Sequence, residues 1–129
     1  MSVAPRELLA SAEEIRKTQS DEAGHRATIS RAYYAAYHAA YAFHVSLPSP
    51  GSVGKATGRH EQLVSQLTTP TFSPANPRNL LSRRVGTILR DVARARVVAD
   101  YSIGANLGVA DADAAILKSR EILKACTGA

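Results

Sequence analysis

The stretch SRAYYAAYHAAYAFH, residues 30–44, sets four tyrosines, one arginine and two histidines among alanines in what reads as one long helix. A helix that needed only a hydrophobic core would normally use leucine and isoleucine, because these side chains bury more apolar area per residue. The composition of this stretch therefore specifies something other than bulk burial.

At 100° per residue, a helix over this stretch has two faces. One face carries small or apolar side chains, against which a neighbouring helix can pack closely: Ala32, Ala35, Ala36, Ala39, Ala42 and Phe43. The other face carries the polar and aromatic side chains: Ser30, Arg31, Tyr33, Tyr34, Tyr37, His38 and Tyr41. Because buried tyrosine hydroxyls need hydrogen-bond partners, we expect this second face to border a polar cleft or polar residues of another helix. The alternative is a tyrosine core whose hydroxyls are satisfied inside the protein.

Outward from this stretch, the sequence predicts five helices and no strand, an all-α fold in a single domain over residues 1–129. The expected helices run from Pro5 to about Gln19, from Ser20 or Asp21 to about Ser46, over 58–67, from Pro77 to about Ser102, and from Asp111 and Asp113 to near Cys126 and Gly128. Two proline-rich loops, LPSPG (47–51) and TTPTFSPANP (68–77), separate the middle helices.

Length and composition favour a cytoplasmic protein. The chain has 129 residues and a single cysteine, Cys126, which excludes an internal disulfide and favours a reducing compartment. The N-terminus MSVAPRELLASAEE has charges in its first turns and does not resemble a secretory signal. No apolar run approaches the roughly 18 residues that span a bilayer, so we expect no membrane association.

The positive charge is concentrated in one segment. Residues 78–96 hold six arginines and one aspartate, so they account for the whole formal charge of +5. Arginine favours fork-shaped contacts with phosphate or carboxylate groups. This segment therefore predicts an anionic partner, such as nucleic acid, although an arginine-rich helix face can also be a solvated surface.

Arg96 differs from the other arginines of the expected helix 77–102. Arg83, Arg90 and Arg94 line up opposite the apolar stripe, whereas Arg96 falls on its edge with Asp100 one turn later. Residues four apart can pair along a helix. Either Arg96 and Asp100 form a structural ion pair, or they mark a polar site where this helix meets the tyrosine-rich one, packed antiparallel so that His38 lies near Arg96 or Asp100.

Three motifs together resemble the HEPN superfamily: SRAYYAAYHAAYAFH, the short GRHEQL segment at 58–63, and RARVVADYS at 94–102. The resemblance is to the branch whose members carry the motif RAYYAAFHAA early in the chain and, late in the chain, an arginine followed after a few residues by ADY. It covers roughly residues 5–125. It implies an all-α, up-and-down bundle of four to five helices that usually dimerises.

The resemblance also implies a function. Many HEPN proteins are metal-independent endoribonucleases that act as toxins or defence factors, often with a minimal nucleotidyltransferase as partner and antitoxin. Other members bind RNA or a nucleotide, beside such a nucleotidyltransferase, without cutting. A third class stays open on the residues alone, a helical interaction module that dimerises through the alanine face.

The catalytic signature of HEPN nucleases is an arginine, four to six residues, and a histidine in the later helix. Here, no histidine follows Arg94 or Arg96 at that spacing. Arg31 and His38 in the earlier helix do have the spacing, and seven positions place them within about 20° of each other on a helix.

Metal-free RNA cleavage needs a base to take the proton of the 2′-hydroxyl and a cation to stabilise charge on the phosphate. Histidine suits the first role because its ordinary pKa is about 6.5. The expected catalytic residues are His38 as base, Arg96, Asp100 and Tyr101. The expected substrate-binding residues are Arg31, Tyr34, Arg90 and Arg94. No cofactor is expected.

Two other motifs do not predict a site. His60 and Glu61 lack the second histidine of a zinc-binding helix, so no metal site is predicted. GSVGKATG at 51–58 has the wrong glycine spacing for a phosphate-binding loop. A polar cleft on so short a chain, together with the resemblance, favours a symmetric homodimer in which arginines of two copies face one groove.

Overall fold

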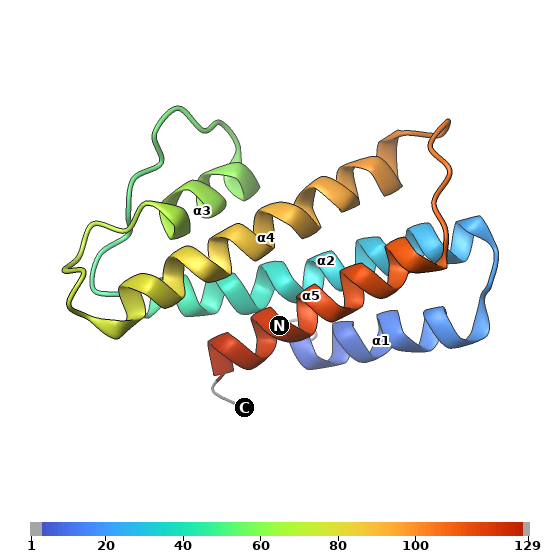
Figure 1. The fold of residues 1–129 in the computed structure, drawn as a ribbon, viewed down its shortest axis with the longest axis horizontal. Helices are drawn as coiled ribbons and strands as arrows, with labels where there is room; N and C mark the ends of the chain where they lie inside the picture. Colours follow the sequence, from blue (N-terminus) through green and yellow to red (C-terminus); the bar gives the residue numbers. More distant parts are fainter. Residues whose placement is uncertain (1–3, 128–129) are drawn as a thin grey trace.

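The computed structural model describes residues 4–127, which form five α-helices and no β-strand (Figure 1). The helices are α1 (Pro5–Thr18), α2 (Glu22–Val45), α3 (Arg59–Thr68), α4 (Pro77–Tyr101) and α5 (Val109–Thr127). The all-α prediction is confirmed, and α5 begins two residues before the expected Asp111. The expected end of the last helix at Gly128 lies outside the described residues.

The helix starts follow from local capping chemistry. Asp21, rather than Ser20, caps α2, because its carboxylate accepts a hydrogen bond from the Gly24 amide at 2.9 Å. Asn76 caps α4 in the same way through the Arg78 amide, and Pro77 occupies the first helical turn, where its missing N–H costs no hydrogen bond.

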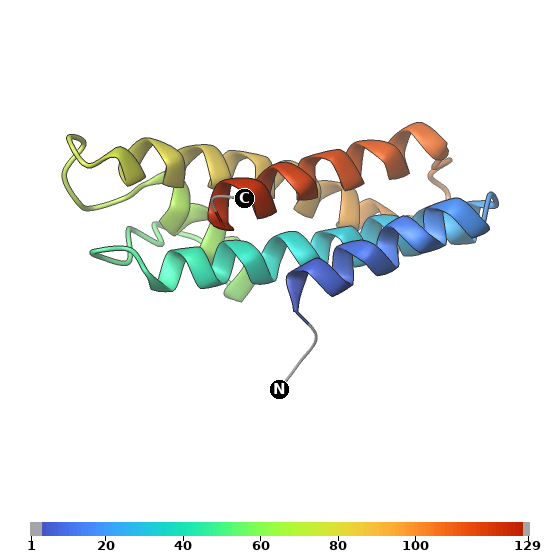
Figure 2. The same cartoon turned by 90° about the horizontal axis from the view of Figure 1, so that it is seen from below.

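The four long helices alternate in direction along the chain, so α2 and α4 run antiparallel as expected (Figures 1 and 2). The shorter α3 packs on the first half of α4 (Figure 1). One apolar cluster joins α2, α3, α4 and α5 around Tyr33, Leu67 and Leu89. A second joins α1, α2, α4 and α5 around Leu9, Ile29 and Ile116. Both clusters contain α2, which is therefore the central helix of the bundle.

The central position of α2 changes the two-face prediction for residues 30–44. Tyr33 and Tyr37, expected on a cleft-facing side, are core residues with 1% and 7% of their surface exposed. Ala42, expected on the packed face, is exposed. A two-face division assumes neighbours on one side only, whereas α1, α4 and α5 surround α2 on several sides.

Candidate functional site

A groove of about 710 Å³ lies between the start of α3 and the second half of α4, beside α2. We call it the arginine groove. Its lining comes from three helices: Tyr33 of α2, His60, Glu61 and Val64 of α3, and Arg90, Ala93, Arg94, Arg96, Val97 and Val98 of α4. Three arginines that the sequence predicted as site residues thus share one surface with a histidine that it did not predict.

Arg96 is a largely buried arginine of the groove, with 15% of its side chain exposed. Its guanidinium lies 5.1 Å from the ring centre of Tyr33, 5.8 Å from that of Tyr34 and 6.0 Å from that of Tyr101. These distances are within the range of cation–π attraction. Its Nη1 also donates to Asp100 Oδ2 at 3.3 Å, which is the ion pair that the four-residue spacing predicts.

One donor of the Arg96 guanidinium, Nε, is buried and unsatisfied. It has no hydrogen-bond partner within residues 4–127, an exception to the rule that buried polar groups are hydrogen-bonded. Burial by itself lowers the pKa of Arg96, but its tyrosine neighbours and Asp100 outweigh that effect and raise it. The guanidinium therefore stays charged at physiological pH.

His60 is the histidine of the arginine groove. Its Nδ1 is hydrogen-bonded to the Tyr33 hydroxyl, and its ring stacks on Tyr37 with ring centres 4.2 Å apart. Within residues 4–127, Nε2 has no hydrogen bond, and it is not fully buried. Burial, reinforced by Arg96 and Arg59, lowers the pKa of His60 below its ordinary 6.5. The ring is therefore neutral at pH 7 and able to accept a proton.

The tyrosines around His60 remain uncharged. Burial raises the pKa of Tyr33 well above its usual range, and the charge of Arg96 only partly opposes this. Burial also raises the pKa of Tyr37. Both hydroxyls therefore keep their protons at physiological pH. Tyr33 matches the alternative of a satisfied tyrosine core, with His60 as the partner of its hydroxyl.

His38 has a different position from the one expected. It is exposed and lies edge-on to Tyr37, with ring centres 5.4 Å apart. The α2 residues that contact Arg96 are Tyr33 and Tyr34, one turn earlier, and none of the contacts found in residues 4–127 joins His38 to Arg96 or Asp100. His38 therefore lies beside Tyr37, whose ring stacks on His60, but it does not line the arginine groove.

The remaining predicted residues divide between the groove and other surfaces. Tyr34 and Tyr101 are 38% and 71% exposed beside Arg96, where they form an aromatic margin. Arg31 instead donates to the Ser11 hydroxyl of α1 at 3.2 Å. Because α1 and α3 contact α2 on different sides, Arg31 lies away from the arginine groove (Figure 1).

One signal in the sequence could have identified His60. Leu63, Val64 and Leu67 are the buried residues of α3, and they follow His60 by three, four and seven positions. This is the spacing of one helix face. A histidine in line with an apolar stripe is turned towards the core, so its ring has to find a partner there.

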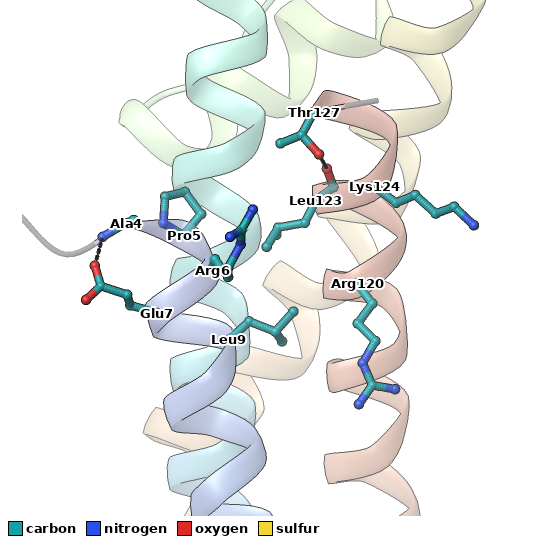
Figure 3. A pocket seen from close by; sticks show the side chains of 9 residues that line it. All are labelled: Ala4, Pro5, Arg6, Glu7, Leu9, Arg120, Leu123, Lys124 and Thr127. Atoms are coloured by element: carbon teal, nitrogen blue, oxygen red, sulfur yellow. Dashed lines mark hydrogen bonds between the residues drawn. The ribbon is translucent and has the colours of Figure 1, made fainter. Parts of the chain in front are cut away.

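A second groove, of about 650 Å³, lies between the start of α1 and the end of α5 (Figure 3). Leu9 and Leu123 face the gap from opposite helices, and the Arg6 side chain reaches into it. Glu7 turns back to accept a hydrogen bond from the Ala4 amide at 3.0 Å. None of the predicted site residues lines this groove, so the arginine groove is the candidate site.

Comparison with known proteins adds no relatives: no family model, curated protein or solved structure matches the chain. In the part of the chain that the structure describes, no group of three or more histidine, cysteine or acidic side chains is arranged to hold a metal ion. None of the helices between residues 4 and 127 combines the length and apolar character needed to cross a bilayer.

Proposed function

We propose that the chain is a HEPN-type protein that cleaves single-stranded RNA without a metal at the arginine groove. One observation carries this proposal: a histidine with a lowered pKa, His60, shares a groove with Arg90, Arg94 and Arg96. Acid–base chemistry on a phosphodiester requires a neutral base and cations for the phosphate. The groove brings both together.

The roles follow from the positions of the side chains. Arg90 and Arg94, on the groove surface of α4, bind the phosphates that flank the cleaved bond. In the tautomer that carries its proton on Nδ1, the Tyr33 oxygen accepts from Nδ1–H, and Nε2 of His60 carries the lone pair that takes the 2′-hydroxyl proton. Arg96, which lines the same groove, stabilises with its guanidinium charge the charge that develops on the phosphate oxygens.

The reaction balances without an added reagent. The 2′-oxygen loses its proton to His60 and attacks phosphorus, the bond to the 5′-oxygen breaks, and that oxygen leaves as a hydroxyl after taking a proton from water. His60 then returns its proton to water. The products are a 2′,3′-cyclic phosphate and a 5′-hydroxyl end. The exposed rings of Tyr34 and Tyr101 offer surfaces on which unpaired bases stack, which favours single-stranded RNA.

The biological setting belongs to the same proposal. A HEPN nuclease of this kind acts as a toxin or defence factor, held in check by a minimal nucleotidyltransferase antitoxin, in the cytoplasm and as a homodimer. The likeness of residues 30–44 and 94–102 to the HEPN motifs supports this setting.

A non-catalytic function is the second candidate. It is favoured by the end of α4, where residues 97–103 contain no histidine. In that case the arginine groove binds RNA or a nucleotide without cutting it, and the protein acts as the binding subunit beside a nucleotidyltransferase.

Incubation of the pure protein with a single-stranded RNA in excess EDTA tests the proposal. We expect cleavage that survives chelation, with cyclic phosphate at the new 3′ ends. The Arg96→Ala variant, purified in parallel, excludes a contaminating nuclease if it loses the activity. RNA binding without cleavage by the parent protein would establish the non-catalytic function instead.

A further inference from the structure

Arg26, on the first turns of α2, binds the carboxyl end of α4 and the loop that follows it. Its Nη1 donates to the carbonyl oxygens of Ala99 at 2.8 Å and Val98 at 3.3 Å. Its Nη2 donates to those of Ala105 at 2.7 Å, Ser102 at 2.9 Å and Ile103 at 3.4 Å. One guanidinium thus reaches five backbone carbonyls, on a side chain with 20% of its surface exposed.

Glu22 completes this arrangement. Its carboxylate accepts hydrogen bonds at 3.2 Å from Arg26 Nη2 and from the Leu107 amide. The Leu107 amide and Arg26 lower the pKa of Glu22, so the carboxylate is ionised at neutral pH. We call Glu22, Arg26 and the backbone groups that they bind the α4 clasp.

The end of α4 has few other means of satisfying its last carbonyls. The final four carbonyls of a helix have no partner within the helix, and cations are favoured there by the helix dipole. The last turn of α4 holds no basic residue, and Ser102 follows it in an ordinary negative-φ conformation instead of a glycine cap. Arg26 therefore supplies from α2 the cation that α4 lacks.

The clasp acts on the turn of α4 that carries the groove residues. The carbonyls of Val98 and Ala99 belong to the backbone between Arg96 and Asp100, and Tyr101 follows directly. If this turn frays, Asp100 and Tyr101 lose their positions beside the Arg96 guanidinium. We propose that Arg26 is a positioning residue, which holds the end of α4 so that Arg96 faces His60; its part in cleavage rests on the proposed function.

Arg26→Ala tests the clasp, with Arg26→Lys as the milder variant. Arg16→Ala is the matched control, because Arg16 is also partly buried and joins two helices by an ion pair, to Asp113 at 2.6 Å, but lies outside the groove. Three quantities are measured for each variant: amide hydrogen exchange, the pKa of His60 by NMR, and the rate of RNA cleavage at saturating RNA.

In Arg26→Ala, we expect the amides of residues 100–107 to exchange at least about tenfold faster, with little change in α1 and α3. His60 is faced by tyrosines and His38 on α2, by Arg59 on α3 and by Arg96 on α4. Because the positive charge of Arg96 lowers the His60 pKa, moving Arg96 away should raise that pKa towards its ordinary value even if the other neighbours stay in place. The cleavage rate at saturation should fall about tenfold or more, with partial recovery in Arg26→Lys.

Two results would overturn the inference. Faster exchange spread evenly over the chain, equal to that in Arg16→Ala, would show a general loss of stability. Faster amide exchange confined to residues 100–107, with an unchanged His60 pKa, would show that the clasp caps α4 without positioning Arg96. If the parent protein cleaves no RNA, the proposed function fails, while exchange and the His60 pKa still decide whether the clasp positions the groove.

Discussion

His60 combines two properties that a proton acceptor needs. Its Nδ1 is fixed by the Tyr33 hydroxyl and its ring by stacking on Tyr37, which together set its orientation. Its lowered pKa keeps the ring neutral above about pH 6.5. The same burial that makes the ring neutral also couples its protonation to folding.

That coupling predicts how stability depends on pH. The pKa of His60 is lower in the folded protein than the ordinary 6.5 of the unfolded chain, so the unfolded chain binds the proton first. The free energy of unfolding therefore decreases as pH falls below about 6.5. Urea unfolding at about pH 7.5, 6.5 and 5.5 should show a shallower decrease for His60→Gln than for the parent.

His38→Gln is the control for this measurement, because His38 is exposed on the neighbouring helix and has no comparable burial. The free energy of unfolding of His38→Gln should still decrease below about pH 6.5, because His60 and its burial are retained. If the free energy of unfolding decreased equally with falling pH in His60→Gln and in the parent, His60 would have the same pKa in the folded and unfolded chain, which would contradict the prediction.

At the residue scale, the sequence predicted interactions within one helix and missed those between helices. The pairing of Arg96 with Asp100 follows from a four-residue spacing, and the structure confirms it. His60 and Arg96 are 36 positions apart and belong to different helices. Their approach depends on how α3 is placed on α4, and the spacing within one helix carries no information on that placement.

At the scale of the helices, α3 packs tightly against α4 at Gly86, which is buried within α4. A Cβ added there would lie 2.7 Å from Thr68 Cγ2 and 2.8 Å from Leu67 Cβ. Alanine alone would favour the helix by about 0.5–1 kcal/mol. The crowding should outweigh this, so we predict that Gly86→Ala destabilises the protein by about 1–3 kcal/mol in urea unfolding.

Gly104→Ala provides the comparison, because nothing lies within 4 Å of a Cβ built at Gly104. It should leave the free energy of unfolding nearly unchanged. An increase in stability for Gly86→Ala would mean that α3 packs less closely on α4 than the structure shows.

Helix boundaries were predictable because they depend on neighbouring residues. Asp21 and Pro77 mark the starts of α2 and α4 through capping and fixed φ, and the structure places both starts accordingly. The burial of α2 was less predictable. Tyr33 is buried because α2 has neighbours on several sides, and a single helix wheel does not contain that information.

For the whole molecule, three of the exposed apolar side chains lie together near the end of α4. Val97, Tyr101 and Ile103 are 50%, 71% and 91% exposed. A surface of this kind favours self-association. We predict that sedimentation equilibrium at tens of micromolar gives twice the chain mass of 13.7 kDa. Ile103→Asp should shift the protein towards monomer, and a parent protein that sediments only as monomer would contradict the dimer.

Of the overall arrangement of the helices, only the fold class could be predicted. The sequence predicts an all-α fold, and the resemblance adds the helical bundle. The position of α3, which completes the arginine groove, depends on the two connections of residues 46–58 and 69–76. These segments lack a periodic pattern, so their paths follow from tertiary packing rather than from local sequence.

The central claim, that His60 is the base in a groove of arginines, is tested most directly by the cleavage rate at saturating RNA in EDTA. We predict that His60→Ala lowers this rate by about 10² to 10⁴. His38→Ala should keep the parent's rate, and Arg90→Ala should keep it while needing more RNA to saturate. Cleavage by His60→Ala at the parent's rate would contradict the assignment, as would a loss of rate confined to His38→Ala.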